Sequence, residues 1–457
     1  MHIRTFVLAG LSLLLLAASA CAAIPALPAD SVQEPDGSVP EYSPSQPVPS
    51  EPDEAVSEPV SHGTPVEITD RKLQFLTAKT FSSNRTVSDL GKAFKTGYAD
   101  FAIGLLRAAD SKNGKLISPL SVLTCLQMAA NGAAGQTLDE MQSVLCGLDT
   151  EELNQLLYSY MESLTNTEDA RLESANALWV TSRPDFHIEE SFVRQIENTF
   201  RADVVSADLT IPETTDAIND WCSEHTDGMI PKILEDQSLK EDSLMVLLNA
   251  LCFDAEWSTT YPEYAVSKGV FHGEDGDRAV SMMSSKESYL PGENGKGFLK
   301  MYKGGHYAFV GLLPDEGVSL ADYLNSLTGE SWLSLFDSIR RSADVKLPKF
   351  SFDWDCSLKE TLHTMGMETV FTKDSDLSGL GWTDDHNAIK IDDVLHKTHI
   401  EVDESGTRAA AVTAVIACEV TSIEDRPLLI FDRPFVYAIV DTTSFLPLFI
   451  GIATDVG

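Results

Sequence analysis

Positively charged residues are scarce in this chain of 457 residues. Lys and Arg number 33 against 70 Asp and Glu, which gives a formal net charge of −37 at pH 7. A chain this negative is repelled by nucleic-acid phosphates and by anionic lipid surfaces. The composition therefore argues against nucleic acid as a partner, and it restricts membrane contact to an attached lipid.

Signatures of catalysis and metal binding are also missing. The sequence holds no G-x-S-x-G, H-E-x-x-H, G-x-x-x-x-G-K or G-x-G-x-x-G motif, which argues against the common hydrolase, zinc-protease and nucleotide-binding sites. Glu404-Ser405-Gly406 is faintly similar to a trypsin-like serine site, but it lacks the leading Gly and a matching His. His396 and His399 would lie on opposite faces of a strand, a poor arrangement for a metal. We expect no enzyme, no metal and no cofactor.

Cysteine pairs at redox or zinc spacing are absent as well. Most of the cysteines are expected to be small buried hydrophobic residues, while Cys418 falls in a segment that we expect to be exposed. The seven are Cys21, Cys125, Cys146, Cys222, Cys252, Cys356 and Cys418.

Residues 1–20 have the pattern of an export signal. Arg4 precedes the apolar run Phe6–Ala18, which is too short to be a membrane-spanning helix with these flanks. Ala18-Ser19-Ala20-Cys21 is similar to a bacterial lipobox, although Ala stands where Leu is usual. The same residues also suit an ordinary signal peptidase. We predict a bacterial lipoprotein, secreted and tethered to the cell surface by a lipid on Cys21.

The next stretch, residues 22–66, contains ten Pro and eight acidic residues but no Lys or Arg. Such a segment cannot bury enough apolar surface to offset the ordering of its backbone. We predict a disordered acidic linker over residues 21–85 and a globular domain over residues 86–457.

Within that domain, the segment His396–Val420 combines a predicted strand, a glycine and an alanine-rich run. Alternate residues after Gly406 would share one face of a strand, whereas Arg408 would lie on the other face. That face carries no charge, so the segment is able to lie between two strands without burying a charged side chain. Its members are Thr407, Ala409, Ala411, Thr413, Val415 and Ala417.

Other motifs follow in a fixed order from about Ser88 to Asp455. Ser118 and Pro119 have the types of a helix cap and a first helical residue. Asn249 interrupts an apolar strand, Leu247–Phe253. Lys349 follows another predicted strand, and Arg433-Pro434-Phe435 opens a C-terminal apolar hairpin. This ordered set, together with the hinge-like segment around Gly406, resembles the serpin family.

The resemblance implies an α+β serpin fold with three β-sheets, about eight or nine helices and an exposed reactive-centre loop. It implies a hinge formed by Glu404, Gly406, Thr407, Ala409, Ala410, Ala411 and Thr413. It also implies a salt bridge between Glu404 and Lys349 beside Trp257, which we call the breach. The polar residues beneath the parting strands, called the shutter, would be Ser118, Ser121, Asn249 and His396, with Asn249 bonded to His396.

The same resemblance implies a suicide-substrate inhibitor. A target protease would cut the loop and become acylated by the cut end. The severed segment from Thr407 would then insert into the large sheet. The fourteen steps from Gly406 to Val420 correspond to roughly 46 Å at about 3.3 Å per residue. The implied partner is a serine protease, with a cysteine protease as the alternative, and we expect a monomer.

Two counts place the cut bond differently. The usual hinge length predicts cleavage between Val420 and Thr421, whereas counting back from Pro434 predicts Ile423-Glu424. We adopt the hinge count because the sheet sets the length of the inserted strand. Either bond presents a β-branched residue, which suits an elastase- or subtilisin-like pocket, while Glu419 keeps a glutamyl-specific target open. Arg426 precedes Pro427, which argues against trypsin-like targets.

The main alternative is a non-inhibitory serpin fold that serves as a binding or adhesion module on the cell surface. Such a module tolerates charged or bulky residues on the inward face of the hinge, and here there are none. A hydrolase is disfavoured by the missing motifs.

Overall fold

The computed structural model describes residues 63–77, 89–109, 115–235, 239, 243–339, 341–407 and 426–456. All of them belong to one contact unit, Val60–Gly457. Several predictions concern residues outside these ranges. They are the export signal, Cys21, the hinge residues Ala409, Ala410, Ala411 and Thr413, and the scissile pair Val420 and Thr421 with the rest of the loop, residues 408–425.

Nine α-helices are found in the described residues. α2 begins as the sequence predicts, because Pro119 occupies its first turn and the Ser118 side chain caps it by accepting from the Ser121 amide. None of the described helices is both long and apolar enough to cross a membrane. The helices are α1 Gly91–Ala108, α2 Pro119–Ala130, α3 Gly135–Val144, α4 Thr150–Ser163, α5 Glu190–Phe200, α6 Pro212–Glu224, α7 Leu320–Ser326, α8 Gly329–Ser334 and α9 Lys359–Thr364.

Seven strands form the first sheet, in the order β1-β5-β3-β6-β15-β14-β12. β14 alternates as predicted, with Thr398, Ile400 and Val402 buried and the residues between them more exposed. The strands are β1 Leu73–Phe75, β3 Ala170–Thr181, β5 Asp203–Ala207, β6 Met245–Glu256, β12 Phe350–Ser357, β14 Leu395–Val402 and β15 Gly406–Thr407.

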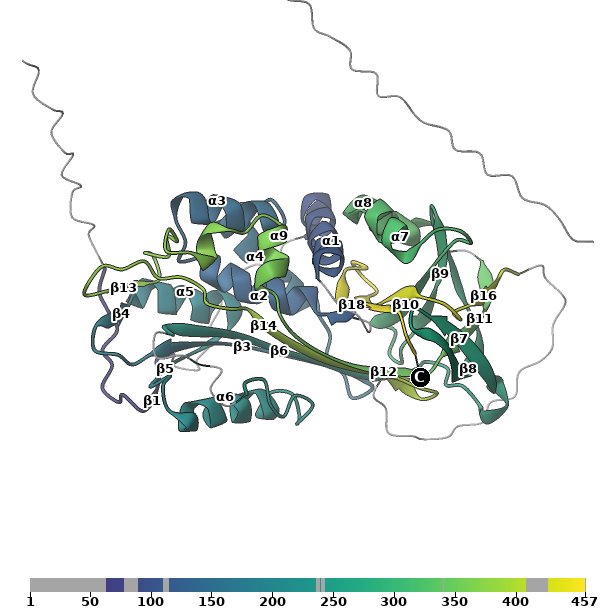
Figure 1. Cartoon of the computed structure of the whole chain (residues 1–457), viewed down its shortest axis with the longest axis horizontal. Coiled ribbons are helices and arrows are strands. Elements are labelled where there is room, and N and C mark those ends of the chain that lie inside the picture. The colour runs from purple at the N-terminus through teal and green to yellow at the C-terminus, as the bar shows by residue number, and fades with distance from the viewer. Residues whose placement is uncertain are drawn as a thin grey trace, which may run out of the picture. The chain divides into compact units, whose positions relative to one another are not determined.

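Helices cover both faces of this sheet (Figure 1). α6 lies on one face, and α2 and α5 lie on the other. Because side chains of β3 alternate between faces, Leu178 and Val180 join the larger hydrophobic core, whereas Trp179 packs in a smaller cluster with Ile218 and Trp221 of α6. At β3 the sheet therefore separates two apolar layers, whereas the face of β14 that carries Lys397, His399 and Glu401 is more exposed.

A second, nine-stranded sheet carries the C-terminal hairpin, whose two strands β17 and β18 are fully buried. Most of its ladders are antiparallel, and β16 joins β11 in parallel. The strands are β2 Lys115–Ile117, β7 Val266–Gly273, β8 Gly276–Pro291, β9 Gly295–Met301, β10 Tyr307–Pro314, β11 Ser342–Pro348, β16 Leu428–Ile430, β17 Phe435–Asp441 and β18 Pro447–Ala453.

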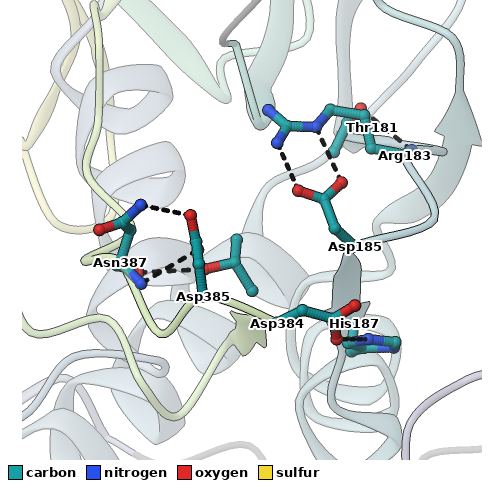
Figure 2. Close-up of polar contacts among 8 residues, drawn as sticks. Thr181, Arg183, Asp185, His187, Asp384, Asp385 and Asn387 are labelled. Atoms are coloured by element: carbon teal, nitrogen blue, oxygen red, sulfur yellow. Dashed lines mark hydrogen bonds and ion pairs between the residues drawn. The ribbon is translucent and has the colours of Figure 1, made fainter.

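The third sheet pairs β4 (Phe186–Ile188) with β13 (Gly381–Thr383). Figure 2 shows the polar contacts around it: Arg183 binds Asp185, and the His187 ring nitrogen Nε2 lies 2.8 Å from Asp384 Oδ1. β4 comes next in the chain after β3, which ends at Thr181. That end of the first sheet is opposite the end at which β15 lies. Three sheets and nine helices in the described part of the chain confirm the predicted α+β class.

One part of the predicted linker is wrong. Residues 63–77 fall within the range assigned to a disordered segment, yet β1 pairs antiparallel with β5. The amide of Gly63 also donates to the Glu189 carboxylate at 2.7 Å. The reason is physical: the edge of β5 offers unpaired backbone groups, and Leu73–Phe75 supplies a strand that satisfies them. The Pro-rich composition that motivates the prediction thins out before this point.

Candidate functional site

The first two hinge residues lie inside the first sheet. Gly406 pairs with Glu256 and Thr407 with Ala255 of β6, while Thr407 also pairs with Val402 of β14. β15 runs antiparallel to both neighbours, so β6 and β14 run parallel to each other. Within the described residues, no ladder joins β6 to β14 except through β15. The two strands therefore stand one strand apart at this end of the sheet.

Gly406 allows this close approach. A Cβ atom added to it would lie 2.1 Å from the Ala255 carbonyl oxygen, well inside contact distance. A side chain here would force β15 away from β6. A glycine is therefore required at the position where the hinge passes into the sheet.

A narrow cavity of about 20 Å³ lies next to Thr407. Its walls come from both flanking strands, with Leu251, Cys252 and Phe253 of β6 on one side and His399, Ile400 and Glu401 of β14 on the other. The volume is close to that of one water molecule. Free space thus continues between β6 and β14 beyond the residue already inserted.

The turn between β14 and β15 is held by the breach. Lys349 forms a salt bridge with Glu404, and the Trp257 indole donates to the Asp403 carbonyl oxygen at 2.9 Å. The backbone amide of Trp257 donates to the Ser405 carbonyl oxygen at 2.8 Å. The structure therefore brings together Trp257, Lys349 and Glu404, the three residues that the resemblance grouped.

The charge of Glu404 is stabilised by its partner. Partial burial acts to raise the pKa of this carboxyl, but the hydrogen bond and the positive charge of Lys349 outweigh burial, and the pKa lies below its usual value. Both side chains are about one third exposed, at 34% each. Solvent screening therefore limits what this ion pair contributes to stability.

A second ion pair beneath Trp257 was missed by sequence reasoning. Lys300 Nζ lies 2.7 Å from Glu287, and the Lys300 side chain is only 3% exposed. Its amine also lies 4.3 Å from the centre of the Tyr261 ring and 5.3 Å from that of Trp257. Burial lowers the pKa of Lys300, while Glu287 opposes that effect. The available signal was a lysine within the otherwise apolar Phe298–Met301 segment of β9.

The shutter residues meet where α2 begins. The Ser118 amide donates to His396 Nε2 at 3.0 Å, and the Ser121 hydroxyl donates to the Asn249 carbonyl oxygen at 3.3 Å. Burial lowers the pKa of His396 to about 4, so the imidazole is neutral at pH 7 and accepts through Nε2. Three elements, α2, β6 and β14, thus supply this polar group.

The predicted bond between Asn249 and His396 is wrong for this structure. Asn249 Nδ2 instead donates to Asn176 Oδ1 at 2.6 Å and to Ser174 Oγ at 3.4 Å, both on β3. Among the described residues, the buried Asn249 Oδ1 has no hydrogen-bond partner. Asn249 stands directly opposite Asn176 in the ladder between β6 and β3, so its side chain bonds to that neighbouring strand. Asn176 was not singled out from the sequence, although it is a polar residue in an apolar strand.

No cluster of three or more His, Cys, Asp or Glu residues that could hold a metal occurs in the described ranges. What the described residues do show at this site is a set of strand pairs around β15. The site defines a class of protein: a mixed α+β domain whose large sheet admits part of its own loop as a further strand.

Comparison with known proteins identifies the family. The family model for serpins (serine protease inhibitors) matches residues 96–456, which is most of the chain. The chain belongs to the serpin family. Its general function is accordingly protease inhibition, and its partner is a protease.

One relative and two solved structures of another illustrate the match. Serpin-Z10 of Arabidopsis thaliana is 29% identical over 388 residues, covering 80% of this chain and 99% of the relative. The native-state structure of the thermophilic serpin Tengpin superimposes with a TM-score of 0.79 at 36% identity, covering 84% of this chain and 100% of its own. The latent-state structure of Tengpin gives 0.71 at 37% identity, with 81% and 100% coverage.

Proposed function

We propose that this serpin inhibits an elastase- or subtilisin-like serine protease as a suicide substrate, and that it is not itself an enzyme. The observation that carries the proposal is the position of Thr407 between β6 and β14, antiparallel to both. The flanking strands run parallel at a separation that one further strand fills, and the segment after Thr407 has the alternation to fill it.

The reaction begins on the loop. The nucleophilic oxygen of the protease attacks the carbonyl carbon of Val420, the bond to the Thr421 nitrogen breaks, and the new amine leaves with a proton. An acyl-enzyme results. Inserting residues 407 to 420 between β6 and β14 then moves the acylated end by roughly 46 Å. The protease would arrive at the end of the sheet that β4 and β13 flank, and its distorted active site would no longer admit water.

The comparison with the two Tengpin structures supports a starting fold like that of the native state. The TM-score is higher for the native state than for the latent state, 0.79 against 0.71. A chain that starts before insertion retains the free energy that insertion releases. This stored free energy is what the proposed mechanism requires.

A direct test mixes the purified chain with an elastase- or subtilisin-like protease and separates the products on a denaturing gel. We expect a covalent band at the summed mass of the two proteins. A cut loop with fully active protease would instead favour the alternative function, a binding or adhesion module. A covalent band that forms only with a papain-like protease would show that the target is a cysteine protease. Sequencing the released C-terminal fragment distinguishes cleavage after Val420 from cleavage after Ile423.

We further propose that the chain is a bacterial lipoprotein monomer, tethered by a lipid on Cys21 and held off the surface by the acidic linker. The lipobox-like Ala18-Ser19-Ala20-Cys21 supports this location. Labelling cells with a fatty-acid probe, with and without Cys21→Ala, tests it. No labelling of either protein would leave ordinary secretion, and labelling that persists in the variant would place the lipid on another residue.

A further inference from the structure

The hydroxyl of Thr407 meets one particular side chain. Tyr302, which directly follows β9, places its hydroxyl oxygen 2.5 Å from Thr407 Oγ1. Both residues are buried, with Tyr302 at 0% and Thr407 at 2% exposure. Burial also raises the pKa of Tyr302, so the phenol keeps its proton and can donate. The first inward hinge residue is therefore bound through its hydroxyl by a residue outside the first sheet.

The Tyr302 ring has little freedom to move. It stacks on Trp257 with ring centres 4.5 Å apart and planes at 11°, and it meets Phe253 of β6 edge-on at 5.0 Å. Its backbone forms a β-bridge with Trp257. Trp257 in turn holds the turn at Asp403 and Ser405 through its indole and amide nitrogens. The hydroxyl that faces Thr407 is thus held on a rigid aromatic support.

Register is what such a contact controls. The side-chain period of a strand is two, so a slip of one residue exchanges its two faces. After Thr407 the sequence continues with Arg408, and a slip by one residue would turn that guanidinium to the buried face on which the Thr407 side chain meets Tyr302. A buried unpaired charge costs several kcal/mol and would stop insertion. Correct pairing of the first residue therefore decides whether the rest of the segment is able to follow.

We propose that Tyr302 is a positioning residue for loop insertion, whose hydroxyl holds Thr407 and thereby sets the register of the inserting strand before the loop is cut. This inference rests on the proposed function and deepens it. The bond holds Thr407 where it already lies, so it acts on the start of insertion and not on the acylation chemistry. Losing it lowers the fraction of molecules that insert before the acyl bond is hydrolysed.

The test compares variants by the stoichiometry of inhibition, the number of inhibitor molecules consumed per protease inactivated. Tyr302→Phe removes only the phenol oxygen, and Thr407→Val removes only the facing hydroxyl. We expect each to raise the stoichiometry by up to about fivefold, the factor that one net hydrogen bond represents. The double variant should be no worse than either single variant, because both remove the same bond. Thr407→Ser, which keeps the hydroxyl, should stay close to the wild type.

Tyr307→Phe is the matched control. Tyr307 is also fully buried, but its hydroxyl donates to the Thr165 carbonyl oxygen at 2.6 Å and does not contact the hinge. It should lower the melting temperature without changing the stoichiometry. Unchanged inhibition by Tyr302→Phe, or additive effects in the double variant, would overturn the proposal. If Tyr302→Phe does not fold, Thr407→Val against Thr407→Ser decides the same question.

Failure of the proposed function would look different. In that case the wild-type chain forms no covalent complex. Insertion is then measured by the rise in melting temperature after a protease cuts the loop. A slower or smaller rise for Tyr302→Phe than for Tyr307→Phe supports the positioning role. Identical rises for the two variants refute it, whatever the wild type does to the protease.

Discussion

The breach and the shutter lie along the same pair of strands, yet they are bonded to very different degrees. At the breach, the turn at residues 403–406 is held by Trp257 and Lys349, and the buried Thr407 hydroxyl by Tyr302. At the shutter, the described residues leave the buried Asn249 Oδ1 without a partner. The neutral His396 there accepts one hydrogen bond, from the backbone amide of Ser118.

Under the proposed mechanism, this difference indicates the end of the sheet at which insertion begins. A buried polar atom without a partner costs about 1–3 kcal/mol, so the shutter retains a penalty that the breach has already removed. The hinge end behaves as a completed part of the sheet, while the middle of the opening is still unsatisfied. A strand moving down between β6 and β14 would therefore start from the well-bonded end.

The largest expected effect comes from placing a charge at the breach. Thr407→Arg puts a guanidinium on the buried face of the sheet, against Tyr302, which cannot neutralise it. We expect inhibition to be abolished and the loop to be cut without a covalent complex on a denaturing gel. Arg408→Ala, on the opposite face of the segment, should inhibit normally. Retained inhibition by Thr407→Arg would contradict insertion from this residue.

The buried ion pair beneath Trp257 should have the next largest effect. Lys300→Met leaves the Glu287 carboxylate, 12% exposed, without its cation. We expect a loss of about 3–5 kcal/mol in the free energy of unfolding, measured in urea. The double variant Lys300→Met with Glu287→Gln should recover most of it. A single variant as stable as the wild type would show that the pair does not stabilise the fold.

The pH dependence of the free energy of unfolding reports on His396 in the shutter. His396 has a pKa of about 4 in the folded state against 6.5 ordinarily, so below pH 6.5 the unfolded chain takes up a proton that the folded chain excludes. The free energy of unfolding should therefore fall between pH 6.5 and pH 4, by up to about 3 kcal/mol, and not above pH 6.5. His396→Gln should flatten this slope in urea titrations. His399→Gln, partly exposed on the same strand, should keep it.

The smallest effect is expected at the exposed part of the breach. Glu404→Ala removes the partner of Lys349, and at 34% exposure the loss in stability should stay within about 1 kcal/mol. Asp185→Ala breaks a pair of similar exposure beside β4 (Figure 2) and is the matched control. Thermal melting should report similar shifts for both, whereas only Glu404→Ala should change the stoichiometry of inhibition. Equal stoichiometries of inhibition for the two variants would show that this salt bridge does not affect the hinge.

Residue patterns alone indicate many of the local features of this fold. The alternation in β14 and the cap at Ser118 depend on neighbours a few residues away, and the structure confirms both predictions. The pairing of Lys349 with Glu404 came from the family resemblance, because nothing in the sequence between them specifies it. The predicted Asn249 bond is wrong, since its partner depends on which strand lies beside β6.

Short-range spacing specifies the periodic elements and the uncharged face of the hinge, so the order of residues is enough to predict both. The folded structure is needed to bring together Tyr302 and Thr407, 105 residues apart, and Lys300 and Glu287 on neighbouring strands. It also decided that β15 already separates β6 from β14. The reason is that strand order and register are properties of the whole assembled sheet, and no local pattern encodes which side chains that sheet brings face to face.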